Sequence, residues 1–481
     1  MKCLIVRMVI AMFIFFFLSS CSVPDGDNDN KAVVDARSLK LPELKFDLPQ
    51  PERVELANGM VIYLFEDRQI PVVSFYAVIR AGMIYEPSEK AGLASLTGEV
   101  LRSGGTRNIN ARELDEKLEF NAITCEFECR LDRIVALLTT RTENLDEAIG
   151  FFADILRNPQ FEEARIELAK QKAIERFIRE SDEPYDLVTR EFEKIVYRNH
   201  PYSRRLGGYP ETIKKITRDD ILNFYSRYFH PNNIIIGVAG DFAKEDMLAK
   251  INNYFSNWQK FPIDFPAVKM TEYILDRHLI YIPKDLQQAS FFIGHIGVDR
   301  LNPDYFSIVV MNFILGEDFI SRLNENVRTK AGLAYAVGSY WNYYKFGGDF
   351  VAYCSTKTES SFDAVSRILD ELKRIRDEAV PEKELENAKS SLCNKYVFKF
   401  ETGEDIMKIY VDNEFMGLPK NYLKQYIDNV KRVTAVDVQN AAKKYIHPDK
   451  TVIVIIGADE AINTFPKDFG NFQRVEIKEE K

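Results

Sequence analysis

The sequence predicts an α+β protein of two homologous domains, each a mainly antiparallel sheet with helices packed on one face. Three observations indicate this: an internal repeat, short β-branched apolar segments, and longer segments with apolar residues at helical spacing. The repeat consists of six marks that recur at one constant offset of 217 residues, which points to an internal duplication. The matched pairs are Thr217 and Thr434, Asp220 and Asp437, Tyr228 and Tyr445, His230 and His447, Pro231 and Pro448, and Gly240 and Gly457.

Each copy of the repeat predicts a helix followed by a strand. Thr217 and Asp220 have the spacing of a capping box, so we expect a helix to begin there and to end near Tyr228. The apolar runs 234–239 and 451–456 are short and rich in Ile and Val, and we expect both to be buried strands.

The first half of the chain adds two strands and two helices to this scheme. The β-branched and aromatic runs 72–81 and 134–140 are expected to be strands. Residues 144–158 carry apolar side chains on one helical face, with an Asn at the start and Asn-Pro at the stop. A long charged helix is expected from about 162 to 179.

The second half follows the same pattern. The strands expected there are 278–282 and 290–296, and the expected helices are 305–315, 361–378 and 381–394. We therefore predict a first domain over residues 51–258, an interdomain linker over 259–275 that contains Pro262 and Pro266, and a second domain over 276–481.

The N-terminus has the features of a bacterial lipoprotein signal. Residues 1–20 have a basic start and a short apolar run, and residues 18–21 read Leu-Ser-Ser-Cys, similar to a lipobox. Cys21 would then carry the lipid, and Ser22, which is not Asp, favours the outer over the inner membrane. Residues 21–50 are polar and form the expected tether. The alternative is an uncleaved anchor with a chance cysteine.

Charge and cysteine content narrow the class of protein further. The formal net charge is −9 and falls to −11 once the signal with Lys2 and Arg7 is removed, so a nucleic-acid partner is not expected. Cys125 and Cys129 would lie about 13 Å apart on one strand face, too far for a disulfide. We interpret the four cysteines outside the N-terminal segment as small buried hydrophobes, and a Cys354–Cys393 link stays open.

One segment carries most of the functional information. Residues 82–106 read GMIYEPSEKAGLASLTGEVLRSGGT, which closely resembles the active-site stretch of the insulinase (pitrilysin-type) zinc metallopeptidases. In that family H-x-x-E-H follows the Gly-Leu-Ala. Here Ser95 and Glu99 stand at the two His positions and Gly98 stands at the Glu position. The zinc ligands and the water-activating carboxylate are therefore replaced.

The resemblance extends over nearly all of residues 51–460 and implies the duplicated insulinase-like fold. The similar segments are 56–59, 143–161, 206–213, 217–240, 314–323 and 328–335. The family's third zinc ligand, a Glu about 76 residues beyond the motif, falls at Arg176 or at Glu175 one position before it. No two of the five histidines have ligand spacing, so we expect no metal on this chain.

A second family feature is retained in the other half. Arg328 and Tyr335 stand seven residues apart, as do an Arg and a Tyr that reach the zinc site from the facing domain in similar proteins. A guanidinium and a phenol can both donate hydrogen bonds to a peptide carbonyl or to the oxyanion formed from it. The alternative is that both are ordinary surface residues.

Two functions follow from the resemblance. The chain resembles the non-catalytic subunit of a two-chain periplasmic zinc peptidase, whose partner would carry H-x-x-E-H and zinc, with a peptide as substrate. It would close the chamber and bind substrate through Arg328 and Tyr335. The alternative is a binding or scaffold protein without a role in proteolysis. A hydrolase that uses Ser95 and Glu99 has little support, because no His lies near Ser95 in sequence.

Overall fold

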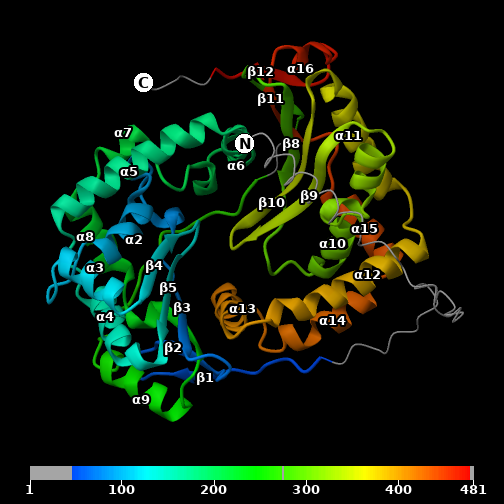
Figure 1. Ribbon diagram of the computed structural model, residues 1–481. Coiled ribbons are helices and arrows are strands. Elements are labelled where there is room, and N and C mark those ends of the chain that lie inside the picture. The colour runs from blue at the N-terminus through cyan, green and yellow to red at the C-terminus, as the bar shows by residue number, and fades with distance from the viewer. Residues whose placement is uncertain (1–45, 273–275, 477–481) are drawn as a thin grey trace, which may run out of the picture. The chain divides into compact units, whose positions relative to one another are not determined.

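The computed structural model describes residues 46–272 and 276–476, and those from Asp47 onward pack as one unit (Figure 1). The predicted signal 1–20, the lipid site Cys21 and most of the predicted tether lie outside the described residues. The proposals for these segments stay predictions.

The first sheet has six strands in the order β1-β2-β6-β3-β5-β4. Only the β2–β6 pair is parallel, and the other four pairs are antiparallel. The strands are β1 Glu52–Glu55, β2 Val61–Glu66, β3 Val72–Ile79, β4 Thr124–Cys129, β5 Ile134–Arg141 and β6 Ile234–Gly240.

The second sheet repeats this topology in the order β12-β7-β11-β8-β10-β9. The sheets differ at one edge, because β1 pairs antiparallel with β2 whereas β12 pairs parallel with β7. The strands are β7 His278–Pro283, β8 Gln288–Ile296, β9 Ala334–Tyr344, β10 Gly347–Lys357, β11 Val452–Gly457 and β12 Asn471–Arg474. The α+β class and the duplication predicted from the sequence are confirmed.

The predicted helices are present with ends shifted by a few residues. In the first half the helices are α2 Leu93–Ser103, α3 Ala111–Phe120, α4 Leu145–Arg157, α5 Glu163–Asp182, α6 Pro184–Tyr197, α7 Pro210–Ile213, α8 Arg218–Tyr228 and α9 Lys244–Phe255. In the second half they are α10 Tyr305–Asn312, α11 Ser361–Asp377, α12 Glu382–Val397, α13 Gly403–Met416, α14 Tyr422–Arg432, α15 Ala435–Tyr445 and α16 Glu460–Asn463. None of the helices in the described ranges is long and apolar enough to cross a membrane.

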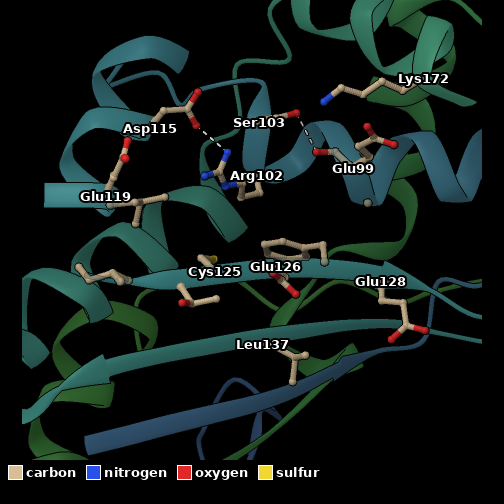
Figure 2. Close-up of a pocket in the computed structure, with 15 residues that line it drawn as sticks. Glu99, Arg102, Ser103, Asp115, Glu119, Cys125, Glu126, Glu128, Leu137 and Lys172 are labelled. Atoms are coloured by element: carbon tan, nitrogen blue, oxygen red, sulfur yellow. Dashed lines mark hydrogen bonds and ion pairs between the residues drawn. The ribbon is translucent and has the colours of Figure 1, made fainter. Parts of the chain in front are cut away.

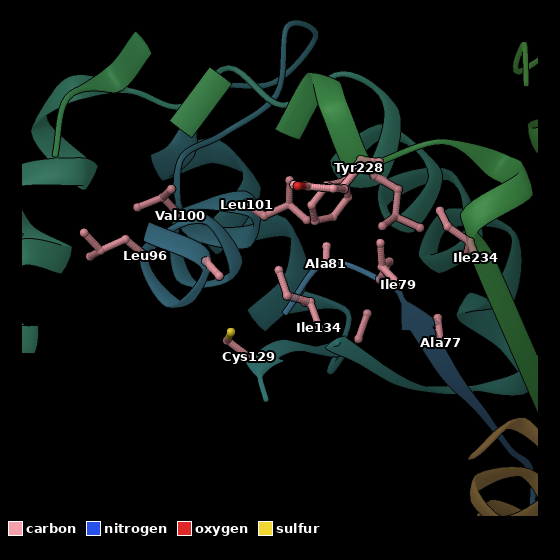
Figure 3. Packing of buried hydrophobic residues seen from close by; sticks show 14 of the residues in the cluster. Ala77, Ile79, Ala81, Leu96, Val100, Leu101, Cys129, Ile134, Tyr228 and Ile234 are labelled. Atoms are coloured by element: carbon pink, nitrogen blue, oxygen red, sulfur yellow. The ribbon is translucent and has the colours of Figure 1, made fainter. Parts of the chain in front are cut away.

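The buried face of α2 joins the helices of the first half to its sheet. Leu96, Val100 and Leu101 pack into one apolar cluster with Ile134 of β5 and Tyr228 of α8 (Figure 3). All five side chains are at most 1 % exposed. Because this packing fixes α2 against the sheet, it also fixes the positions of Ser95, Gly98 and Glu99.

The two predicted capping boxes form at the starts of α8 and α15. The backbone N–H of Thr217 donates to Asp220 Oδ2 at 2.8 Å, and the N–H of Asp220 donates to Thr217 Oγ1 at 3.2 Å. Thr434 and Asp437 repeat this arrangement at 2.9 and 3.2 Å.

We expect Thr217→Ala and Thr434→Ala each to lower the free energy of unfolding by about 1 kcal/mol, because each leaves a helix N–H without its acceptor. Urea unfolding measures the change. Thr329→Ala, at an exposed position, is the control, and equal effects at all three positions would contradict a capping role.

Each half also contributes one helix to the sheet of the other half. In the first sheet, Gly237 lies between Ile236 and Val238 of the apolar cluster and therefore faces the opposite side. There α13 packs, since a Cβ built on Gly237 would come within 2.8 Å of Met407 Cβ. The hydroxyl of Tyr76 in β3 donates to Asp412 Oδ1 in α13 at 3.0 Å.

The reciprocal contact is made by α6 on the second sheet. The ring of Phe192 lies 5.9 Å from that of Phe292 in β8, and the ring of Tyr185 lies 5.3 Å from it. A Cβ built on Gly294 would come within 2.7 Å of Phe192. This exchange of helices was not predicted from the sequence, and it adds a second helical layer to the predicted one.

Candidate functional site

The helix that carries the altered motif begins at a glycine and takes its cap from a distant residue. Gly92 has a φ of +96°, and a Cβ there would lie 2.5 Å from Ile213, so only glycine suits this position. Because glycine has no side chain to cap α2, Glu86 does so. Its carboxylate accepts from the N–H groups of Gly92 at 2.9 Å and Ala94 at 2.8 Å.

The capping role of Glu86 was not predicted from the sequence. The available signal was a helix start without Ser, Thr, Asp or Asn, which requires a cap from elsewhere. Burial raises the pKa of Glu86 to about 7, although the two backbone N–H groups and the nearby Arg204 act to lower it. The carboxyl group therefore titrates near neutral pH while it holds the start of α2.

We expect Glu86→Ala to lower the free energy of unfolding by about 2–4 kcal/mol, because it leaves two buried N–H groups without acceptors. Glu86→Gln retains one acceptor and should restore part of this loss.

Since the pKa in the folded state lies above the ordinary 4.5, the contribution of Glu86 to stability is complete below pH 4.5 and is lost as the pH rises through 7. Unfolding measured from pH 4.5 to 7.5 should therefore show a steeper decline for the native protein than for Glu86→Gln. Parallel pH profiles would contradict this assignment.

Two cavities adjoin the positions that replace the zinc motif, and Glu99 lines both. The larger, of about 1040 Å³, lies between α2 and the edge strand β4 (Figure 2). The smaller, of about 370 Å³, is lined by Ser95 and Glu99 from α2 and by Arg176 and Glu180 from α5. Gly98 is buried, and a Cβ on it would face Ile134 of β5 at 3.8 Å.

The charges in these cavities are mixed and partly paired. In the larger cavity Arg102 binds Asp115 at 2.5 Å, and Ser103 Oγ donates to the backbone carbonyl of Glu99 at 2.8 Å (Figure 2). In the smaller cavity Arg205 Nε donates to Glu180 at 2.9 Å. A surface of this kind can bind polar groups.

Many of the residues around the altered motif are charged. The fold brings Arg176 to the cavity with Ser95 and Glu99, whereas Glu175 is exposed and lines neither cavity. Arg176 shares this cavity with the carboxylates of Glu99, Glu128 and Glu180, and no imidazole lines either cavity. Over the described parts of the chain, no three His, Cys, Asp or Glu residues gather in a way that could hold a metal ion.

Two of the histidines and four of the cysteines lie in structural surroundings. His295 and His447, distant in sequence, meet with ring centroids 5.3 Å apart, and the backbone N–H of His447 donates to His295 Nε2 at 3.2 Å. Burial lowers the pKa of His295 to about 3, so its ring is neutral. The four cysteines, Cys125, Cys129, Cys354 and Cys393, are buried free thiols, which confirms the interpretation as buried side chains and leaves Cys354 and Cys393 unlinked.

Tyr335 lies on the edge strand of the second sheet, Arg328 lies in the helical turn before that strand, and neither residue lines either cavity. Arg328 belongs to the π-helical turn Asn324–Thr329, with its guanidinium carbon 5.1 Å from the ring centre of Phe319. Tyr335 is the second residue of β9, an edge strand, and is 51 % exposed. Phe319 and Ile320 are 72 % and 67 % exposed. Neither residue therefore shares a cavity with Ser95 or Glu99, and Tyr335 is accessible to another molecule.

Both edges next to the functional positions are strands with one free side. β4 ends the first sheet and lines the larger cavity from Thr124 to Glu128, and β9 ends the second sheet beside Arg328. A strand with unpaired N–H and carbonyl groups can bind an extended peptide by strand addition.

Comparison with known proteins defines the class to which this fold and site belong. A family model described as "Insulinase (Peptidase family M16)" matches residues 61–209, and one described as "Peptidase M16 inactive domain" matches residues 215–392. A crystal structure of a peptidase M16 inactive domain from Pseudomonas fluorescens superposes with a TM-score of 0.78 at 24 % identity, covering 85 % of this chain and 98 % of that one. The chain belongs to the insulinase (M16) family, as a bacterial-type member with two domains.

The relatives carry both peptidase and non-peptidase names. An "Uncharacterized zinc protease" of Rickettsia felis is 27 % identical, over 87 % of this chain and 94 % of the relative. A "Non-peptidase homolog YmxG" of Helicobacter pylori is 24 % identical, over 84 % and 93 %. A "Probable mitochondrial-processing peptidase subunit beta" of Arabidopsis thaliana is 22 % identical, over 89 % and 81 %. The chain is therefore an M16 peptidase or a non-peptidase homologue of one.

Proposed function

We propose that this chain is the non-catalytic subunit of a heterodimeric zinc peptidase. The proposal rests on a difference between the two candidate sites of the chain. Ser95, Gly98 and Glu99 offer no zinc site, whereas Arg328 and Tyr335 keep two hydrogen-bond donors at an accessible sheet edge. Such a chain suits a partner with the opposite set, an intact H-x-x-E-H motif that binds the zinc.

In the complex this chain would supply binding and orientation. An extended peptide substrate would be held by strand addition, and the phenol of Tyr335 and the guanidinium of Arg328 would donate to its reacting carbonyl oxygen. Hydrogen-bond donors that are already in position when the reaction begins stabilise the negative charge that develops on this oxygen. A relative named as a peptidase subunit, and another named a non-peptidase homologue, support both halves of the proposal.

The proposal includes a location in the bacterial cell envelope. A lipid on Cys21 would anchor the chain to a membrane, the outer membrane rather than the inner, and residues 21–50 would hold the folded part on the periplasmic side. A Cys21→Ala variant that is processed and fractionates with the membranes as the native chain does would contradict this part.

Co-purification tests the subunit role. The tagged full-length chain, solubilised in detergent from its native cells, should bring down one stoichiometric partner with H-x-x-E-H. The mixture should hydrolyse an unstructured peptide when neither chain alone does. Zinc removal by a chelator should abolish the activity of the mixture and leave the melting temperature of this chain unchanged.

A second candidate is a binding or scaffold protein without a role in proteolysis. The name of the non-peptidase relative favours it, and so do the exposed Phe319 and Ile320, which a permanent partner could cover. A partner without the zinc motif, or a stable complex without peptidase activity, would favour this candidate over the first.

A further inference from the structure

One buried side chain links the turn that carries Arg328 to the strand that carries Tyr335. Asn324 begins the π-helical turn Asn324–Thr329 and is only 9 % exposed. Its Nδ2 donates to the backbone carbonyl of Val337 at 3.1 Å. Because Val337 lies two residues beyond Tyr335 on β9, this amide fixes the turn to the strand next to the phenol.

The same amide also holds the segment that supports Arg328. Nδ2 of Asn324 donates to the backbone carbonyl of Asp318 at 3.2 Å. Phe319 follows Asp318 in the chain, and the guanidinium carbon of Arg328 lies 5.1 Å from the centre of its ring. Asn324 is therefore connected to the support of Arg328 on one side and to the strand of Tyr335 on the other.

The chemistry of an asparagine suits this place. Both partners are backbone carbonyl oxygens, which can only accept, and the amide nitrogen has two hydrogens to donate. Within the described residues, no other side chain of the turn forms a hydrogen bond to β9. Asn326 donates to Glu371 of α11 at 2.9 Å, and Glu325 forms an ion pair with Lys330. The hydrogen-bonded link from this turn's side chains to β9 therefore depends on Asn324.

The two donors themselves are not engaged elsewhere in the chain. Over residues 46–272 and 276–476, neither the guanidinium of Arg328 nor the hydroxyl of Tyr335 makes a hydrogen bond or an ion pair. The chain between them passes through Gly332, which has a φ of +64° and where a Cβ would meet no atom within 4 Å. The distance between the two donors is therefore set by what holds the turn and the strand.

We propose that Asn324 is a positioning residue, which holds Arg328 and Tyr335 at the spacing at which both can donate to one substrate carbonyl. This inference rests on the proposed function, because it concerns the same two donors. The π-helical form of the turn supports it, since such turns are rare and occur frequently at functional sites. A displacement of about 1 Å can lower a reaction rate about 10²-fold, so a small loss of alignment should be measurable.

Asn324→Leu removes both hydrogen bonds at a similar side-chain volume. In the complex with the zinc-bearing partner, kcat should fall about 10–100-fold and KM should change less than about threefold, because the donors act mainly in the transition state. Asn312→Leu is the matched control. Asn312 is also buried and donates to a β9 carbonyl, that of Ser339 at 3.4 Å, but it lies outside the turn that carries Arg328. It should lower the melting temperature as Asn324→Leu does and leave kcat within about twofold.

A double-mutant cycle separates positioning from a general effect on the fold. If Asn324 acts through the placement of the phenol, Asn324→Leu should lower kcat by a factor at least about fivefold smaller in a Tyr335→Phe background than in the native chain. Equal factors in the two backgrounds would overturn the proposal. An unchanged kcat in Tyr335→Phe itself would count against the proposed function instead.

Hydrogen exchange of the full chain tests the link without a partner. In Asn324→Leu the amides of residues 318–321 and 334–337 should exchange at least about tenfold faster than in the native chain, whereas those of β11 should not change. Asn324→Ser keeps one donor and should give a smaller increase, which decides the question where Asn324→Leu does not fold. Unchanged exchange in both segments would overturn the proposal, whatever the activity of the complex.

Discussion

Replacing Tyr335 by phenylalanine is expected to lower kcat of the complex with the zinc-bearing partner by about 10²–10³-fold, the usual effect of losing one oxyanion donor. The phenol is 51 % exposed on an edge strand, so the protein itself gains little from the hydroxyl. Assembly with the partner and the melting temperature of this chain should therefore stay unchanged. Peptide hydrolysis under saturating substrate measures the effect, together with the amount of partner that co-purifies.

Two further variants show whether the effect belongs to this site. Arg328→Lys keeps the charge but removes the planar fork, so kcat should fall as well, though less than after Arg328→Ala. Tyr185→Phe removes the hydroxyl of another exposed tyrosine, 57 % exposed on α6, and should leave kcat unchanged. An unchanged kcat in Tyr335→Phe would contradict the substrate role, and loss of the partner in the same variant would indicate a contact between subunits instead.

Replacing Phe192 by alanine is expected to lower the free energy of unfolding by about 3–5 kcal/mol. Its ring is 1 % exposed and fills the space above Gly294, where the second sheet has no side chain of its own. The loss comes from the cavity and from the apolar surface returned to water. Phe120→Ala, at a ring that is 89 % exposed, is the control and should change stability by no more than about 0.5 kcal/mol.

The two tryptophans show whether helix exchange makes the halves unfold together. Trp258 follows α9 in the first half, and Trp341 belongs to β9 in the second. In Trp258→Phe and Trp341→Phe proteins, each remaining tryptophan reports one half. Phe192→Ala should shift both denaturation midpoints by the same amount, because α6 belongs to the first half and packs on the second. A shift of the Trp341 signal alone would mean that the halves unfold independently.

The sequence predicted elements well where a local pattern decides them. The capping boxes at Thr217 and Thr434 and those strands and helices that were predicted are set by neighbours a few residues apart, and the structure confirms them. The cap of α2 was missed, because Glu86 acts six and eight residues ahead of the N–H groups it binds and has none of the usual spacing.

The candidate sites, too, could be predicted from the sequence only in part. The replacement of the motif by Ser95, Gly98 and Glu99 is visible in the sequence, and so is the retained pair Arg328 and Tyr335. Arg176, and not Glu175, lines the cavity with Ser95. Which of the two does so depends on how α5 is rotated about its axis, because neighbouring residues of a helix point in directions about 100° apart. Only packing against the sheet fixes that rotation.

The sequence by itself determined the duplication, the α+β class and the residue types at the altered motif, because these depend on periodicity and on side-chain identity. The tertiary structure alone decided that α6 packs on the second sheet and α13 on the first, and that Arg133 of the first half pairs with Asp412 of the second. Those contacts join residues more than a hundred positions apart. They follow from how whole surfaces pack, and no local pattern in the chain encodes them.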